Sequence, residues 1–108
     1  MIVIDVIGEL DLATAPQLQA YLVEKTAPRP VHVVLDLRGV TFLAAYGLGL
    51  LVVARQGGDG IHGELHLTGV TSSRAVKRAL DLSGLSALFD MHDNEDALLP
   101  ELTRVEEV

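Results

Sequence analysis

Histidines and carboxylates in the second half of the chain are the side chains best suited to metal binding or acid–base chemistry. His62 and His66 lie on either side of Glu64, in the order H-x-E-x-H. Zinc motifs of this kind need both histidines on one face of a helix, whereas these straddle a glycine-containing loop and a strand. His32 and His92 have no partner nearby in the sequence. We therefore expect no metal site and no bound cofactor.

Other residue patterns that support catalysis are also missing. Four carboxylates lie near the C-terminal end: Asp90, Asp93, Glu95 and Asp96. They lack the glycine and the spacing of a calcium loop and are typical of a solvated helix start. The chain has no cysteine, and no serine–histidine–aspartate set or carboxylate pair is recognisable. The Gly47-Leu48-Gly49 segment is too short for a phosphate-binding loop. We expect a protein that is not an enzyme.

The composition describes one acidic domain spanning residues 1–108. Fifteen acidic residues against eight basic ones give a formal net charge of -7, which would repel a phosphate backbone. The densest basic group, Arg74, Lys77 and Arg78, is spaced like the solvated face of a helix. Aromatic residues make up only 4% of the chain, too few for a platform that stacks on single-stranded nucleic acid. We expect a protein partner with basic patches and no nucleic acid.

Targeting and membrane-spanning segments are not recognisable in the sequence. No apolar run approaches the roughly 20 residues needed to span a bilayer, and no basic and apolar leader opens the chain. We expect a cytoplasmic protein that does not bind a membrane.

Strand-like and helix-like patterns alternate along the chain. Alternating or β-branched runs predict strands over residues 2–7, 31–37, 64–69 and 88–92. Helical spacing predicts helices over residues 15–25, 45–57 and 74–82, and a last one after Asp93 in which Val105 faces inward. The alternation is typical of an α/β fold, with a mostly parallel or mixed sheet of about four strands covered by about four helices.

The first predicted strand has nothing upstream with which to form a hairpin. We therefore expect residues 2–7 at an edge of the sheet, where an unpaired strand offers a contact for a homodimer.

The most unusual helix start follows the strand predicted over residues 31–37 and a turn at Arg38-Gly39. N–H groups at a helix N-terminus lack backbone partners and carry partial positive charge, and Ser, Thr, Asp or Asn usually caps them. Here the residues are Ala44, Ala45 and Tyr46, which cannot accept these hydrogen bonds in that way. We expect an uncapped helix N-terminus. Tyr46 is either an interface anchor or a partly buried ring that fills a gap.

Short motifs along nearly the whole chain resemble the STAS domain family, and within it the bacterial anti-sigma factor antagonists. The motifs are residues 8–18 (GELDLATAPQL), the strand and turn over residues 33–40, Phe42-Leu43, Gly47-Leu48-Gly49, residues 79–85 (ALDLSGL) and Phe89. The resemblance implies a single STAS domain that acts by binding. The implied partner is an anti-sigma factor of the ATPase-fold serine kinase type, which otherwise holds a sigma factor inactive. The family's N-terminal strand is expected to be short or missing here.

The sequence departs from this family at the regulatory loop before the central helix. Typical members read Asp-Ser-Ser/Thr-Gly there, and the partner phosphorylates the serine after the aspartate, which breaks the complex. In this chain Ala44 takes the Asp place, Ala45 the phosphoacceptor place and Tyr46 the Ser/Thr place, and only Gly47 matches. The resemblance therefore implies the fold and the partner-binding surface but not the serine switch.

The residues expected to bind the partner lie in this loop and beside the first helix: Asp11, Thr14, Phe42, Ala44, Ala45, Tyr46, Gly47 and Gly49. Thr14 is also a candidate N-cap, and Asp11 is equally well explained as a capping group. Ser72 and Ser73 precede a helix and are best explained as capping residues. Because some relatives have a second phosphosite in this region, they are also candidates for a secondary regulatory site.

A second class of function remains open from the sequence. STAS-type domains elsewhere are sometimes proposed to sense nucleotides or other small ligands, or to serve as interaction scaffolds, and the free N–H groups at residues 45–47 suit an anion. The helix start has no basic side chain, which makes this alternative the weaker one.

Overall fold

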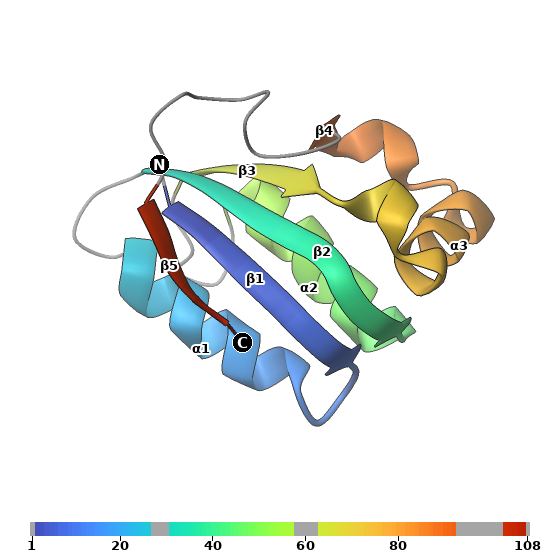
Figure 1. Cartoon of the computed structure of the whole chain (residues 1–108), viewed down its shortest axis with the longest axis horizontal. Coiled ribbons are helices and arrows are strands. Elements are labelled where there is room, and N and C mark those ends of the chain that lie inside the picture. The colour runs from blue at the N-terminus through green and yellow to red at the C-terminus, as the bar shows by residue number, and fades with distance from the viewer. Residues whose placement is uncertain (1, 27–30, 58–62, 93–102, 108) are drawn as a thin grey trace.

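Five parallel strands form one sheet in the computed structural model, which describes residues 2–26, 31–57, 63–92 and 103–107. The strands are β1 (Ile2–Leu10), β2 (Val31–Leu43), β3 (Gly63–Thr68), β4 (Asp90–His92) and β5 (Thr103–Glu107). Across the sheet they follow the order β4-β3-β2-β1-β5, and every pairing is parallel (Figure 1). The predicted α/β class is confirmed, with one strand more than expected.

Three α-helices accompany the sheet in the described part of the chain: α1 (Ala15–Thr26), α2 (Ala45–Gln56) and α3 (Arg74–Ser83). Two short 3-10 helices, η1 (Val70–Ser72) and η2 (Ser86–Leu88), flank α3. Helices α1 and α2 cover one face of the sheet, and α3 lies beside the end of β3 (Figure 1). None of the described helices is long and apolar enough to cross a membrane.

One aliphatic core holds the sheet against the helices. Leu35 of β2 and Ile4 of β1 are fully buried, as are Leu22 of α1 and Leu51 of α2. They belong to one cluster that also includes Val76 of α3. Burial of each such side chain contributes roughly 1.5–3 kcal/mol to folding.

Strand β2 does not end at the predicted turn at Arg38-Gly39 but continues to Leu43. A register shift accommodates the extra length, because Asp5 pairs with Asp36 whereas Ile7 already pairs with Gly39. Two β2 residues thus stand opposite one β1 residue, which is a β-bulge. The Asp36 carboxylate accepts hydrogen bonds from the Arg38 N–H at 3.1 Å and from its Nε at 3.2 Å, which stabilises the bulge. The turn signal was therefore a bulge within one long strand.

The expected edge position of the first strand is wrong. Strand β1 lies between β2 and β5, which pairs with its residues 2–5. Over residues 2–5 the backbone of β1 is therefore paired on both sides and offers no free edge to a second copy.

Strand β5 also replaces the C-terminal end of the last predicted helix. Val105 lies in β5 rather than on the inward face of a helix. Residues 103–107 pair with residues 2–5, and this long-range pairing overrides a helical pattern that rested on few apolar positions. The beginning of that predicted helix, with Asp93, Ala97 and Leu98, lies outside the described residues.

Helix α3 begins at the predicted residue, Arg74, and ends one residue later than predicted, at Ser83. The Ser73 hydroxyl accepts a hydrogen bond from the Val76 N–H at 3.2 Å, which confirms it as the N-cap, and Gly84 ends the helix in the left-handed conformation. The same hydroxyl donates to the Val40 carbonyl at 2.6 Å and is buried. Ser73 therefore joins α3 to β2 as well as capping the helix.

Replacing Ser73 with alanine is expected to lower the free energy of unfolding by about 1–3 kcal/mol, because it removes the cap and leaves the buried Val40 carbonyl unpaired. Urea denaturation followed by circular dichroism measures this. Ser72→Ala at the adjacent exposed position is the control and should change stability by less than about 0.5 kcal/mol. Equal effects of the two substitutions would contradict the assigned role of Ser73.

Candidate docking site

Helix α2 starts at the carboxyl end of β2. Parallel α/β folds place their binding sites at this end of the sheet, where the carboxyl ends of the strands lie. Ala44 is the N-cap residue, with φ -86° and ψ 168°, and no side chain caps the helix. The prediction of an uncapped start is therefore confirmed. The Ala44 N–H donates to the carbonyl of Leu10 at 3.0 Å, which ties the helix start to the end of β1.

Gly47 has a packing role at this helix start. It is buried, and a Cβ atom at this position would lie 2.7 Å from the Leu10 carbonyl oxygen and 2.9 Å from Leu10 Cγ. Only glycine lets α2 approach the end of β1 this closely. Gly49 differs, because it is exposed and a Cβ atom there would meet nothing within 4 Å.

The turn before α1 is held by reciprocal hydrogen bonds between Asp11 and Thr14. The Asp11 carboxylate accepts from the Thr14 N–H at 3.0 Å and from the Ala13 N–H at 2.9 Å. The Thr14 hydroxyl accepts from the Asp11 N–H at 2.9 Å and donates to the Glu9 carbonyl at 2.7 Å. Asp11 therefore caps the turn over residues 11–14 that leads into α1, as one of its two predicted explanations has it. The Thr14 hydroxyl closes the same turn, and it is the Thr14 carbonyl that accepts from the Gln17 and Leu18 N–H groups of α1.

The hydrogen bond from the Thr14 N–H is the largest cause that holds the pKa of Asp11 below its ordinary value. A carboxyl group whose pKa is lower in the folded state stabilises the fold at neutral pH. That contribution is lost as the pH falls through the folded-state pKa.

Apolar side chains are exposed at the same edge of the sheet. Phe42 at the end of β2 is 51% exposed, Tyr46 in the first turn of α2 is 53% exposed, and Leu12 before α1 is 67% exposed. Ala45, between the two aromatic residues, is also exposed. We refer to Leu12, Phe42, Ala45 and Tyr46 as the docking tip. Tyr46 is about half exposed, so its ring is accessible to a partner while also packing on the domain.

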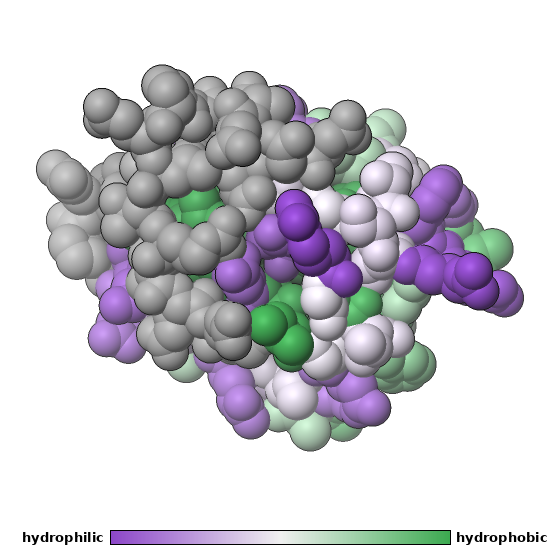
Figure 2. Space-filling model, in the orientation of Figure 1, coloured by the Kyte–Doolittle hydropathy of each residue, from purple (hydrophilic) through white to green (hydrophobic). Residues whose placement is uncertain are grey.

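The surface of α3 is mixed in character. Hydrophilic and hydrophobic side chains both lie in this region (Figure 2): Arg74, Lys77 and Arg78 are exposed, as expected for a solvated helix face, and Leu82 is 75% exposed. Ser72 is exposed beside this helix, whereas Ser73 is buried.

The structure brings the partner-binding candidates to one edge, although Gly47 lies beneath the surface rather than on it. Leu12 was not singled out in the sequence as a surface residue. Its signal was weak, because a leucine two residues after Leu10 and directly before Ala13 is equally compatible with a core position.

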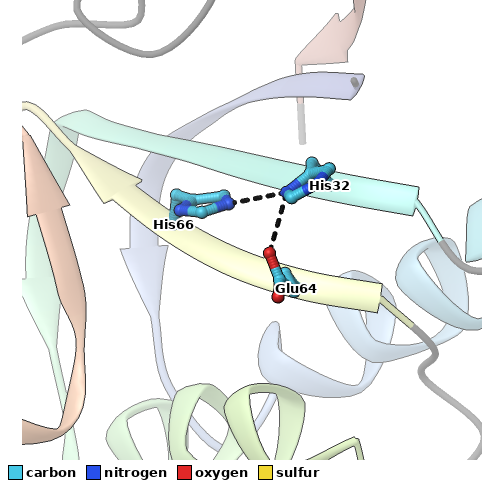
Figure 3. Close-up of side chains that lie close together, drawn as sticks. All are labelled: His32, Glu64 and His66. Carbon is cyan, nitrogen blue, oxygen red and sulfur yellow. Dashed lines mark hydrogen bonds and ion pairs between the residues drawn. The ribbon is translucent and has the colours of Figure 1, made fainter.

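A second group of side chains meets on the sheet face opposite α1 and α2 (Figure 3). His32 Nδ1 lies 3.0 Å from His66 Nε2 and 3.1 Å from Glu64 Oε2. His66 Nδ1 contacts Asp90, and His92 Nε2 lies 3.0 Å from the other Asp90 oxygen. The imidazoles of His92 and His66 lower the pKa of Asp90.

The expectation that His32 and His92 lack partners is therefore wrong. The parallel pairing of Val34 with His66 and of His32 with Glu64 creates the group, and sequence spacing does not show this register. His62 of the H-x-E-x-H pattern lies outside the described residues.

Comparison with known proteins agrees with the fold and with the motifs. A STAS domain model matches residues 1–98. An anti-sigma F factor antagonist of Paenibacillus polymyxa is 30% identical over 103 residues, which cover 94% of this chain and 86% of the relative. An anti-sigma-B factor antagonist of Staphylococcus epidermidis is 36% identical over 90 residues, covering 82% and 78%. The anti-sigma-F factor antagonist RsfB of Mycobacterium tuberculosis is 31% identical over 97 residues, covering 89% and 77%.

A solved structure shares the architecture. The crystal structure of a sulfate transporter family protein from Wolinella succinogenes matches with a TM-score of 0.69 and 24% identity, covering 92% of this chain and 82% of the other. This likeness concerns the fold alone. Together with the family model that spans most of its length, the sheet order and the motifs around α2 place the chain: it belongs to the STAS domain family.

Proposed function

We propose that this chain is an anti-sigma factor antagonist, which binds a kinase-like anti-sigma factor of the ATPase fold and thereby frees a sigma factor. Its family and the names of its relatives support this proposal. The observation that carries it is the docking tip, which exposes two aromatic rings at the uncapped start of α2. Exposed aromatic side chains are typical of protein interfaces.

The proposed activity is binding rather than catalysis. The tip exposes the Ala45 methyl group, a leucine side chain and two rings, and its one hydroxyl is the phenol of Tyr46. The chain carries a net charge of -7, so a partner with a basic rim around an apolar pocket would complement it. An apolar tip of this kind favours a protein surface over an anionic small ligand.

We further propose that the complex is constitutive. Ala45 is the first residue of α2 and is exposed, so a serine there would be open to a kinase. A phosphate would add roughly -1.5 to -2 charges at the tip and oppose docking. Alanine has no hydroxyl and cannot carry this signal. Control of the complex would then rest on the abundance of the protein.

Incubation with the ATPase-fold anti-sigma factor and Mg-ATP is expected to leave the intact mass of the protein unchanged. The double variant Ala44→Asp, Ala45→Ser restores the hydroxyl and the preceding carboxylate of typical family members, and it should gain one phosphate under the same conditions. This variant is the control that the kinase is active on this scaffold. Intact-mass spectrometry of both proteins measures the result.

A phosphate on the unmodified chain would contradict constitutive binding. The first position to map would then be Ser72, which is exposed, rather than the buried Ser73. The proposed antagonism itself is tested separately, by adding the chain to a preformed complex of the anti-sigma factor with its sigma factor. Release of the sigma factor on addition is expected, and failure to release it at saturating concentration would contradict the proposal.

A further inference from the structure

We propose that His32, Glu64 and His66 form a binding site for one divalent transition-metal ion of the zinc class. Three different side chains direct one ligand atom each to the same point above β2 and β3 (Figure 3). The residue types are those that bind Zn²⁺ through nitrogen and carboxylate oxygen. The site lies on the sheet, away from the docking tip, and does not depend on the proposed function.

The spacing of the three ligand atoms agrees with one ion. His32 Nδ1 lies 3.0 Å from His66 Nε2 and 3.1 Å from Glu64 Oε2. Zn–N and Zn–O bonds of about 2.0–2.1 Å in tetrahedral geometry place neighbouring ligand atoms roughly 3.3 Å apart. All three atoms lie within 4.8 Å of one another, so small side-chain movements suffice to surround an ion.

The backbone fixes this set. His32 and Glu64 are paired residues of β2 and β3, and His66 lies two residues further on the same face of β3. The two imidazole rings are close to parallel, with an interplanar angle of 21° and centroids 5.3 Å apart. A metal ion would therefore join two neighbouring strands through side chains that already face one another.

Asp90 supplies the outer support that metal-binding histidines usually have. Its carboxylate contacts His66 Nδ1 from the neighbouring strand β4. With the Nδ1 proton directed at this carboxylate, the lone pair of His66 Nε2 points toward His32 and is available to a metal. His66 is also the least exposed of the three ligands, at 13% of its side chain, so its orientation is set by packing.

His32 Nδ1 lies within hydrogen-bond distance of both His66 Nε2 and Glu64 Oε2. An ion with positive charge and three coordination bonds satisfies all three atoms at once. The fourth tetrahedral position faces solvent, since the side chains of His32 and Glu64 are 53% and 73% exposed, and water would occupy it.

The experiment is a calorimetric titration of tag-free protein with ZnCl₂, repeated with Co²⁺ to record the absorption of a tetrahedral site. We expect saturable binding of one ion per chain. His32→Gln and Glu64→Gln should each weaken binding at least about tenfold, and Asp90→Asn should weaken it by about 10- to 100-fold through the orientation of His66. Zn²⁺ should raise the melting temperature of the unmodified protein but not of His32→Gln.

The matched control is His62→Gln, which removes the first histidine of the H-x-E-x-H pattern. If the ion is bound by His32, Glu64 and His66, this variant should bind Zn²⁺ as tightly as the unmodified protein. If the H-x-E-x-H motif binds the ion instead, the variant should lose Zn²⁺ binding. Circular dichroism must show that His32→Gln is folded. No binding of Zn²⁺ up to about 1 mM, or binding that survives His32→Gln and is lost in His62→Gln or His92→Gln, would overturn the proposal.

Discussion

The Gly47→Ala substitution is expected to lower the free energy of unfolding by about 2–3 kcal/mol and the melting temperature by about 10 °C. The added methyl group would lie 2.7 Å from the Leu10 carbonyl oxygen and 3.1 Å from the Leu10 carbonyl carbon. These are backbone atoms of an interior strand, so the helix rather than the strand must move. That movement also weakens the hydrogen bond from the Ala44 N–H to Leu10.

Gly49→Ala is the matched control, in the same helix and two residues away. Its new Cβ atom would meet nothing within 4 Å, and the position is exposed. Alanine in a helix interior is more stable than glycine by about 1 kcal/mol, so this variant should be more stable than the unmodified protein. Thermal and urea denaturation of both variants thus give shifts of opposite sign. A stabilising or neutral effect of Gly47→Ala would show that α2 does not approach β1 as described.

The Gly47 contact also explains why the docking tip has its shape. Because glycine lets the first turn of α2 lie against the end of β1, Ala45 and Tyr46 reach the same sheet edge as Phe42. In a variant in which α2 moves outward, the tip residues keep their chemistry but lose their relative positions. Gly47→Ala is therefore expected to weaken partner binding as well as stability, since interface geometry tolerates little displacement.

Local chemistry was the most predictable part of this protein. The uncapped start of α2 could be predicted because alanine lacks a side-chain acceptor in any conformation. The cap at Ser73 was predictable for the same kind of reason, since a capping side chain acts on its own helix. Asp11 and Thr14 lie three residues apart, and both side chains can accept a hydrogen bond from a backbone N–H group. The residue types alone could not show which of the two would cap which turn.

Features that depend on strand pairing were not predictable in this way. The bulge after Asp36 resembles a turn in the sequence, because the pair Arg38-Gly39 is compatible with a turn between two elements and with a bulge inside one strand. The position of β1 inside the sheet depends on residues 103–107, which are about a hundred positions away in the chain. The histidine group depends on the register of β2 with β3, and a shift of one residue would place His32 and His66 on opposite faces.

The Ala45→Asp substitution is expected to weaken binding to the anti-sigma factor at least about 100-fold, or about 2.7 kcal/mol, while leaving the fold at least as stable. The carboxylate would lie in the docking tip, at an exposed position directly before Tyr46, where a partner that fits an apolar surface would leave the charge unpaired. The same carboxylate lies at a helix N-terminus, where negative charge is favourable by about 0.3–1 kcal/mol.

Ala45→Asp should thus weaken binding without destabilising the fold, so the two effects can be measured separately. The matched control is Gln56→Asp. Gln56 is the last residue of α2 and is exposed, and it lies about 16 Å along the helix axis from Ala45. The same added charge there should leave affinity unchanged within about twofold and lower stability by about 0.3–1 kcal/mol, because it meets the negative end of the helix dipole. Calorimetric binding and thermal denaturation of both variants measure the four values. Equal losses of affinity would mean that total charge governs the complex, and no loss with Ala45→Asp would mean that the partner binds elsewhere on the domain.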